Sequence, residues 1–139
     1  MLRAPIAVLA AAAVAAGALA APAVASKAPT RSEARFIAKA VRTTSLGGAN
    51  QLDRSWYRVN RIRVSSLSDS WAIAWQTATK AGEGKFQPAY FILAQPQGAK
   101  RWVVMSLGTA LVGCGVAPNV VIKDLTGGTC PPGEGIRGS

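Results

Sequence analysis

The sequence predicts an α+β fold in which an N-terminal helix packs on a four-stranded antiparallel meander sheet and one disulfide holds a short C-terminal helix. Apolar residues recur with helical spacing over residues 34–45, which favours an amphipathic helix. Four runs of strand character follow within residues 56–107, and short turns separate them. Two cysteines then flank a second, shorter helical pattern. These observations predict one domain over residues 26–130 and a disordered tail, rich in glycine and proline, over residues 131–139.

Residues 1–25 have the layout of a secretory signal peptide. A short basic start that ends in Arg3 precedes an unbroken apolar run over residues 6–16, and small residues lead up to Ala25. Cleavage after Ala25 would remove Arg3 and lower the net charge from +10 to +9. The protein is therefore expected to be secreted. The alternative is an uncleaved anchor over residues 4–25, which is long enough to span a membrane.

The first helix of the domain is predicted to have Ser32 as its N-cap and to end before Gly47. Its inward face carries Ala34, Ile37, Ala38, Val41 and Ser45. Another face carries a row of cations, namely Arg31, Arg35, Lys39 and Arg42. Such a row is usually a solvated face, and the alternative is a basic ridge that meets an acidic partner.

The four strands are predicted over residues 56–65, 70–78, 86–95 and 101–107. In the first strand, Ile62 and Val64 are expected to point inward, whereas the residues that alternate with them point outward: Arg61, Arg63 and Ser65. Tyr57 and Val59 have the opposite parity. Either a bulge interrupts this strand, or its beginning packs separately.

The second strand has one face of large residues and one face of small residues. The large face carries Trp71, Ile73, Trp75 and Thr77, and the small face carries Ala72, Ala74 and Gln76. The small face leaves room for another element, and the first helix is the available cover. The third strand is apolar on both faces, as expected for a central strand. The order of elements is like that of the cystatin-like fold or a reduced NTF2-like fold.

The C-terminal helix is predicted from the spacing of Pro118, Val121, Ile122 and Leu125, and Gly127 marks its end. The two cysteines of the chain, Cys114 and Cys130, lie on either side of it. In an exported chain they are expected to bond to each other, and a loop of this length is worth about 3 kcal/mol of stability. Two free thiols or an intermolecular bond are the alternatives.

The composition excludes several kinds of active site. Without histidine, the chain cannot build histidine-based acid–base catalysis, a histidine-activated nucleophile or a histidine metal site. The six carboxylates are spread mostly over helix starts, turns and the tail: Glu33, Asp53, Asp69, Glu83, Asp124 and Glu134. We therefore predict no catalytic residue, no metal and no cofactor.

One run of the sequence suggests a binding surface, because cations alternate with an aromatic ring: Arg54, Trp56, Arg58, Arg61 and Arg63. Such a run can bind a polyanion by charge and stacking. The alternative is that Trp56 anchors the strand in the core while the arginines are solvated. The predicted partners of an exported chain are an anionic cell-wall polymer, lipid headgroups or another protein. No nucleic acid partner is expected, and the chain is predicted to be a monomer.

A further set of residues carries a resemblance that covers roughly residues 57–130: Val64-Ser65, Asp69-Ser70-Trp71-Ala72, Arg101-Trp102-Val103-Val104, Gly108-Thr109, Val112-Gly113-Cys114, Pro118-Asn119-Val120-Val121, Asp124-Leu125 and Cys130. This pattern resembles a group of small secreted proteins of high-GC actinobacteria, in which one disulfide follows a "WA" strand. The resemblance implies a fold and an extracellular location. It implies no activity, and it transfers no catalytic residue.

Three functions are compatible with these observations. The leading prediction is a non-enzymatic secreted domain that binds at the cell envelope, because the chain is strongly basic and lacks catalytic residue types. The second is an inhibitor that inserts its disulfide loop, or the hairpin tip over residues 80–85, into an extracellular hydrolase. The third is a histidine-free hydrolase, which would need two carboxylates converging in one cleft. A deep apolar cavity beneath the first helix would instead favour the binding of a small ligand.

Overall fold

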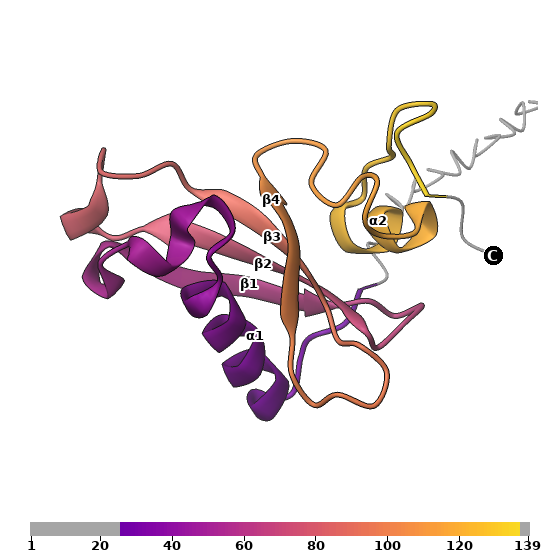
Figure 1. The fold of residues 1–139 in the computed structure, drawn as a ribbon, viewed down its shortest axis with the longest axis horizontal. Helices are drawn as coiled ribbons and strands as arrows, with labels where there is room; N and C mark the ends of the chain where they lie inside the picture. Colours follow the sequence, from indigo (N-terminus) through magenta and orange to yellow (C-terminus); the bar gives the residue numbers. More distant parts are fainter. Residues whose placement is uncertain (1–25, 137–139) are drawn as a thin grey trace, which may run out of the picture.

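The computed structural model describes residues 26–136 and confirms the predicted α+β fold (Figure 1). The helices and strands are α1 (Arg31–Thr43), β1 (Tyr57–Val64), β2 (Trp71–Ala78), β3 (Ala89–Ala94), β4 (Val103–Gly108) and α2 (Asn119–Thr126). Three 3-10 turns lie between them: η1 (Leu46–Gln51), η2 (Arg54–Trp56) and η3 (Lys80–Gly82). The strands pair antiparallel in the order β1-β2-β3-β4, which is the predicted meander.

The predicted leader over residues 1–25 lies outside the described residues. Between residues 26 and 136, no helix has the length and apolarity that a membrane span requires.

The N-cap of α1 is Thr30, so the prediction of Ser32 was wrong. The Thr30 hydroxyl accepts a hydrogen bond from the backbone N–H of Glu33 at 3.1 Å, and the Glu33 carboxylate accepts one from the backbone N–H of Thr30 at 2.7 Å. This reciprocal pair is a capping box, which the Thr-x-x-Glu spacing favours. The helix ends at Thr43, so Ser45 lies beyond it.

The helix α1 covers the sheet face that carries the small residues of β2 (Figure 1). Ile37 and Val41 are fully buried in one core with Ala72 and Ala74. Because alanine side chains are short, the helix can pack close to the strands. The remaining buried residues of this core come from all parts of the sheet and from its surroundings: Ala49, Val64, Ala89, Phe91, Leu93 and Trp102.

The strand β1 contains a bulge, which is one of the two predicted explanations for its change of parity. Its register against β2 shifts between Asn60 and Arg63, and Arg61 has a positive φ of 48°. The extra residue restores the parity of the strand, so Val59 and Ile62 both pack against the core beneath α1.

The prediction that Ser65 points outward was wrong. Ser65 directly follows β1 and is fully buried, and its hydroxyl donates a hydrogen bond to Asp124 at 2.6 Å. The backbone N–H and the hydroxyl of Ser66 donate to the same carboxylate, at 2.8 and 2.9 Å. The strand alternation that assigned Ser65 to the surface therefore ends at Val64, and the β1–β2 turn is bonded to α2.

A second, smaller core lies between α2 and the opposite face of the sheet (Figure 1). Ile73 and Ile92 from the sheet pack there against Val121, Ile122 and Leu125. Each face of the sheet therefore carries a helix, and α2 covers only one end of its face.

The predicted disulfide between Cys114 and Cys130 is confirmed, with a Cα–Cα distance of 5.7 Å. The backbone beside Cys114 passes very close to the second core. A Cβ on Gly113 would lie 2.4 Å from Ile122 and 2.9 Å from Ile92, and its φ of +85° also favours glycine. The disulfide and Gly113 thus hold the connection to α2 tightly against the sheet.

Residues 131–136, which the sequence places in a disordered tail, fold against the beginning of α2. The backbone N–H of Asn119 donates a hydrogen bond to the carbonyl of Ile136 at 2.9 Å, and Pro118 forms a parallel bridge with the same residue. The sequence predicts Pro118 as the first residue of the helix. In the structure Pro118 is the N-cap of α2, and the helix begins at Asn119. Residues 137–139 lie outside the described part of the chain.

Candidate functional site

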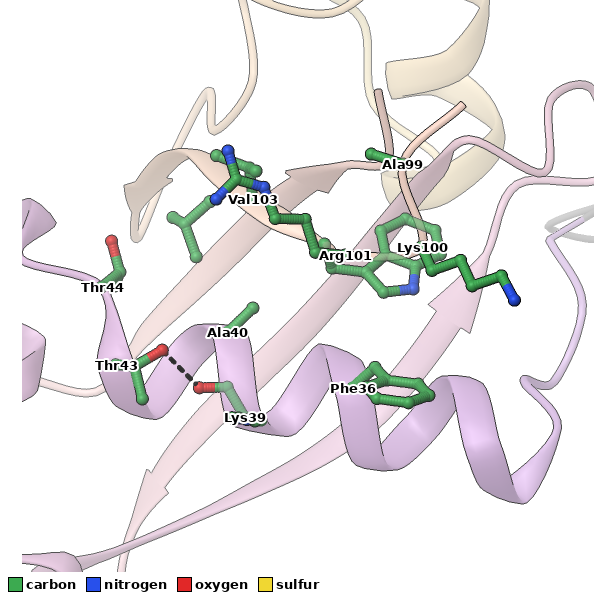
Figure 2. Close-up of a pocket in the computed structure, with 11 residues that line it drawn as sticks. Phe36, Lys39, Ala40, Thr43, Thr44, Ala99, Lys100, Arg101 and Val103 are labelled. Carbon is green, nitrogen blue, oxygen red and sulfur yellow. Dashed lines mark hydrogen bonds between the residues drawn. The ribbon is translucent and has the colours of Figure 1, made fainter. Parts of the chain in front are cut away.

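An open groove with a volume of about 650 Å³ lies between α1 and β4 (Figure 2). One side is the exposed flank of α1, and the other is the β3–β4 loop with the beginning of β4. We call it the α1–β4 groove. Its lining residues are Phe36, Lys39, Ala40, Thr43, Thr44, Ala99, Lys100, Arg101, Trp102, Val103 and Val104.

The groove has an apolar floor because α1 and β4 meet through residues of unequal size. Ala40 has a short side chain, which leaves space beside the helix at this level. Trp102 closes the base and is only 6% exposed, whereas Phe36 stands at the rim and is 50% exposed. An aromatic ring that is half exposed beside a buried one offers apolar surface for a partner to cover.

The rim of the groove is positively charged. Lys39 from α1 and Lys100 and Arg101 from the β3–β4 segment all line the groove, and no acidic residue does. All three side chains are exposed, and none of them forms an ion pair within residues 26–136. The one ion pair found in that part of the chain joins Lys27 to Asp69. The groove therefore combines an apolar floor with uncompensated positive charge.

The predicted run of cations and Trp56 lies elsewhere, on the opposite edge of the sheet, and the structure separates its members. Arg54 is exposed in η2. Arg58 pairs with Thr77 and therefore projects from the sheet face that α1 does not cover. Arg61 is exposed at the bulge of β1.

The other two members of this run already have partners within the protein. The guanidinium of Arg63 donates hydrogen bonds to the backbone carbonyl and to the hydroxyl of Ser26. Trp56 is half-buried, and the ammonium of Lys85 lies 4.9 Å from its ring centroid. The five residues thus form no common concave site, although Arg58 and Arg61 remain accessible.

The hypothesis of a histidine-free hydrolase depends on where the carboxylates lie. Among residues 26–136, no cluster of three or more cysteine, aspartate or glutamate side chains could hold a metal ion. Asp124 is buried and accepts hydrogen bonds from Ser65 and Ser66, which is a structural arrangement.

Sequence reasoning missed the α1–β4 groove, although two signals for it were present. Phe36 interrupts the polar side of an amphipathic helix, where a large aromatic residue is unusual. Lys100, Arg101 and Trp102 place two cations next to a tryptophan before the last strand. Only the fold brings these two segments together, because they lie more than sixty residues apart in the chain.

No protein-family model, no curated protein and no solved structure matches this chain.

Proposed function

We propose that this protein is a secreted, non-enzymatic domain that binds an anionic amphiphile of the cell envelope, such as an anionic phospholipid, in the α1–β4 groove. The observation that carries the proposal is the apolar floor of the groove beneath a rim of three unpaired cations. A signal-like leader and one disulfide are consistent with a location outside the cytosol.

The two halves of the groove match the two halves of such a ligand. Lys39, Lys100 and Arg101 can meet a phosphate headgroup, and each basic residue near an anionic membrane contributes about 1 kcal/mol. Phe36 and Trp102 can contact the acyl region. Covering an exposed ring the size of Phe36 contributes roughly 1.5–3 kcal/mol.

The apolar floor favours a lipid over a cell-wall polymer. A polymer bound only through its negative charges would need the cations and would leave Phe36 exposed to water. A partly inserted amphiphile uses both features at once. The inhibitor hypothesis has less support, because the hairpin tip over residues 80–85 folds back onto η2: a Cβ on Gly82 would collide with the carbonyl of Trp56.

The test compares vesicles of phosphatidylglycerol and phosphatidylcholine with vesicles of phosphatidylcholine alone, using protein purified after export. We expect binding to the anionic vesicles only, and weaker binding as salt is added. Combined replacement of Lys39, Lys100 and Arg101 by glutamine should weaken this binding by at least about tenfold.

The matched control removes the same charge from the other edge of the sheet, by replacing Arg54, Arg58 and Arg61 with glutamine. It should change vesicle binding by less than about threefold, because these residues lie outside the groove. Phe36→Ser keeps every charge and should weaken binding severalfold.

Three results would contradict the proposal. The first is an equal loss in the two triple variants, which would indicate non-specific attraction by net charge. The second is unchanged binding in Phe36→Ser, which would show that the apolar floor is not used. The third is salt-sensitive retention on isolated cell walls without vesicle binding, which would favour an anionic polymer.

A further inference from the structure

The exposed side of α1 carries a row of four cations: Arg31, Arg35, Lys39 and Arg42. We call it the α1 cation row. All four side chains are exposed, and none of them forms an ion pair within residues 26–136. Because they follow one another at intervals of four, four and three residues, they lie within about 80° of each other around the helix axis. Only Lys39 also lines the α1–β4 groove, so the three arginines have no part in that site.

The row is unfavourable for the helix by itself. Side chains three or four residues apart on a helix are neighbours, and like charges at these spacings destabilise it. The acidic residue of α1 does not compensate the row: the Glu33 carboxylate accepts the capping-box hydrogen bond, and no cation of the helix lies three or four residues from it. An anionic partner along the row would remove this repulsion.

Two features of the row fit a flat anionic surface better than an acidic protein. The row is straight and runs for about 16 Å along the helix from Arg31 to Arg42, at 1.5 Å per residue. It also borders the groove, because Lys39 belongs to both and the half-exposed ring of Phe36 stands at the rim beside it. A bilayer offers headgroup charge to the row and an apolar layer to Phe36 at the same time.

We propose that the α1 cation row is the surface by which this protein docks on an anionic bilayer, with α1 parallel to the membrane plane and the α1–β4 groove opening toward the headgroups. Arg31, Arg35 and Arg42 contact phosphate headgroups outside the groove, while the groove takes one amphiphile from the same bilayer. This inference rests on the proposed function, because it identifies the bilayer as the source of the ligand.

The test separates docking from groove binding by offering one lipid in two forms. Vesicles of phosphatidylglycerol and phosphatidylcholine present a charged surface, and sedimentation measures binding to them. Dihexanoylphosphatidylglycerol below its critical micelle concentration presents the same headgroup without a surface, and calorimetric titration measures its binding.

The decisive variant replaces Arg31, Arg35 and Arg42 together by glutamine. It should bind the vesicles at least about tenfold more weakly, because three headgroup contacts are lost. Its affinity for the monomeric lipid should change by less than about threefold, because none of the three arginines lines the groove. The variant should fold, since all three side chains are exposed and outside both cores.

Two controls accompany this variant. Replacing the same three arginines by lysine keeps the charge and should keep vesicle binding within about threefold. Replacing Arg54, Arg58 and Arg61 by glutamine removes equal charge from the opposite edge of the sheet and should also change vesicle binding by less than about threefold.

The orientation can be measured directly by nuclear magnetic resonance of the ¹⁵N-labelled protein on anionic bicelles that carry a nitroxide at the headgroup. We expect the amide signals of α1 to broaden more than those of α2, because α2 packs on the opposite face of the sheet. Stronger broadening of α2 would overturn the docking row.

Unchanged vesicle binding in the Arg31, Arg35 and Arg42 glutamine variant would also overturn it, and would leave the row as a solvated face or a site for an acidic protein. Equal losses in the two glutamine variants would do the same, because net charge alone would then hold the protein. If the unmodified protein does not bind the monomeric lipid, the groove function is contradicted, and the vesicle comparison still decides whether the row docks.

Discussion

Asp124 joins α2 to the β1–β2 turn through one carboxylate. Burial alone would raise the pKa of Asp124, but hydrogen bonds from the hydroxyls of Ser65 and Ser66 and from the backbone N–H of Ser66 outweigh it. The pKa of this carboxyl group therefore lies below its ordinary value in the folded protein. The charged form is the one that stabilises the fold.

Asp124→Asn should lower the free energy of unfolding at neutral pH by about 1–3 kcal/mol, because an amide cannot accept the three hydrogen bonds as a carboxylate does. A lowered folded-state pKa means that the stabilisation is present above the unfolded-state pKa of about 3.9 and is lost as the pH falls through the folded-state value. The difference between the two proteins should therefore shrink below about pH 4. Urea denaturation across the acidic range measures it.

The control for this prediction is Glu83→Gln, which changes an exposed carboxylate in the β2–β3 connection. Its unfolding free energy should follow that of the unmodified protein within about 0.5 kcal/mol. A loss in Asp124→Asn that stays constant at every pH would mean that the charge of Asp124 does not stabilise the fold.

Single residues also set the limit of what the sequence could predict. Nothing near Ser65 or Asp124 in the chain indicates that they bond, since 59 residues separate them. By contrast, strand alternation correctly placed Gln76 on the small face of β2 with Ala72 and Ala74. The burial of Gln76 Nε2 without a hydrogen-bond partner in the described residues could not be predicted, because it depends on segments that are distant in the chain, such as η1 and β4.

At the scale of elements, the N-terminus of α1 offers a direct test of the capping box. Thr30→Ala should lower the free energy of unfolding by about 1 kcal/mol, because the backbone N–H of Glu33 loses its acceptor. Ser32→Ala, at the position first predicted as the cap, should change it by less than about 0.5 kcal/mol, because Ser32 is exposed inside the helix. Chemical denaturation measures both variants, and equal losses would rule out the assignment of Thr30.

The order of the elements followed from local patterns, which is why it was predictable. The first two strands show an alternation, the last two are short apolar runs between turns, and each helix shows its own stripe of apolar residues. The bulges differ in this respect. The parity change between Val59 and Ile62 indicated a bulge in β1. The extra residue of β4, Met105 between Val104 and Ser106, leaves no such mark because Val103, Val104 and Met105 are all apolar and show no alternation.

At the scale of the whole molecule, the disulfide attaches α2 to a fold that is otherwise built by neighbouring strands. Replacing both Cys114 and Cys130 by alanine should lower the free energy of unfolding by about 2–4 kcal/mol, because the unfolded chain regains the entropy of the open loop. Urea denaturation of this variant, compared with the oxidised protein, measures the loss.

The same variant should keep its binding to anionic vesicles under conditions where it remains folded. The α1–β4 groove is formed by elements that do not contact the disulfide, so its lining does not depend on α2. Lost vesicle binding in a folded variant would mean that the C-terminal region takes part in the site.

The α1–β4 groove also belongs to this largest scale. It is assembled from segments that are distant in the chain, and it lies where α1 meets the outer strand β4. Composition predicted a basic binding surface but placed it on β1, where cations are adjacent in the sequence. Adjacent cations are visible in a sequence, whereas a rim that spans two elements exists only after folding.

The two bulges have a consequence for the behaviour of the protein in concentrated solution. In the described part of the chain the meander does not close, so β1 and β4 each present an outer edge with backbone groups that another chain could pair with. Arg61 interrupts one edge and Met105 the other. An added strand would therefore lose register within a few residues at either edge, and this irregularity opposes the stacking of sheets that begins fibril growth.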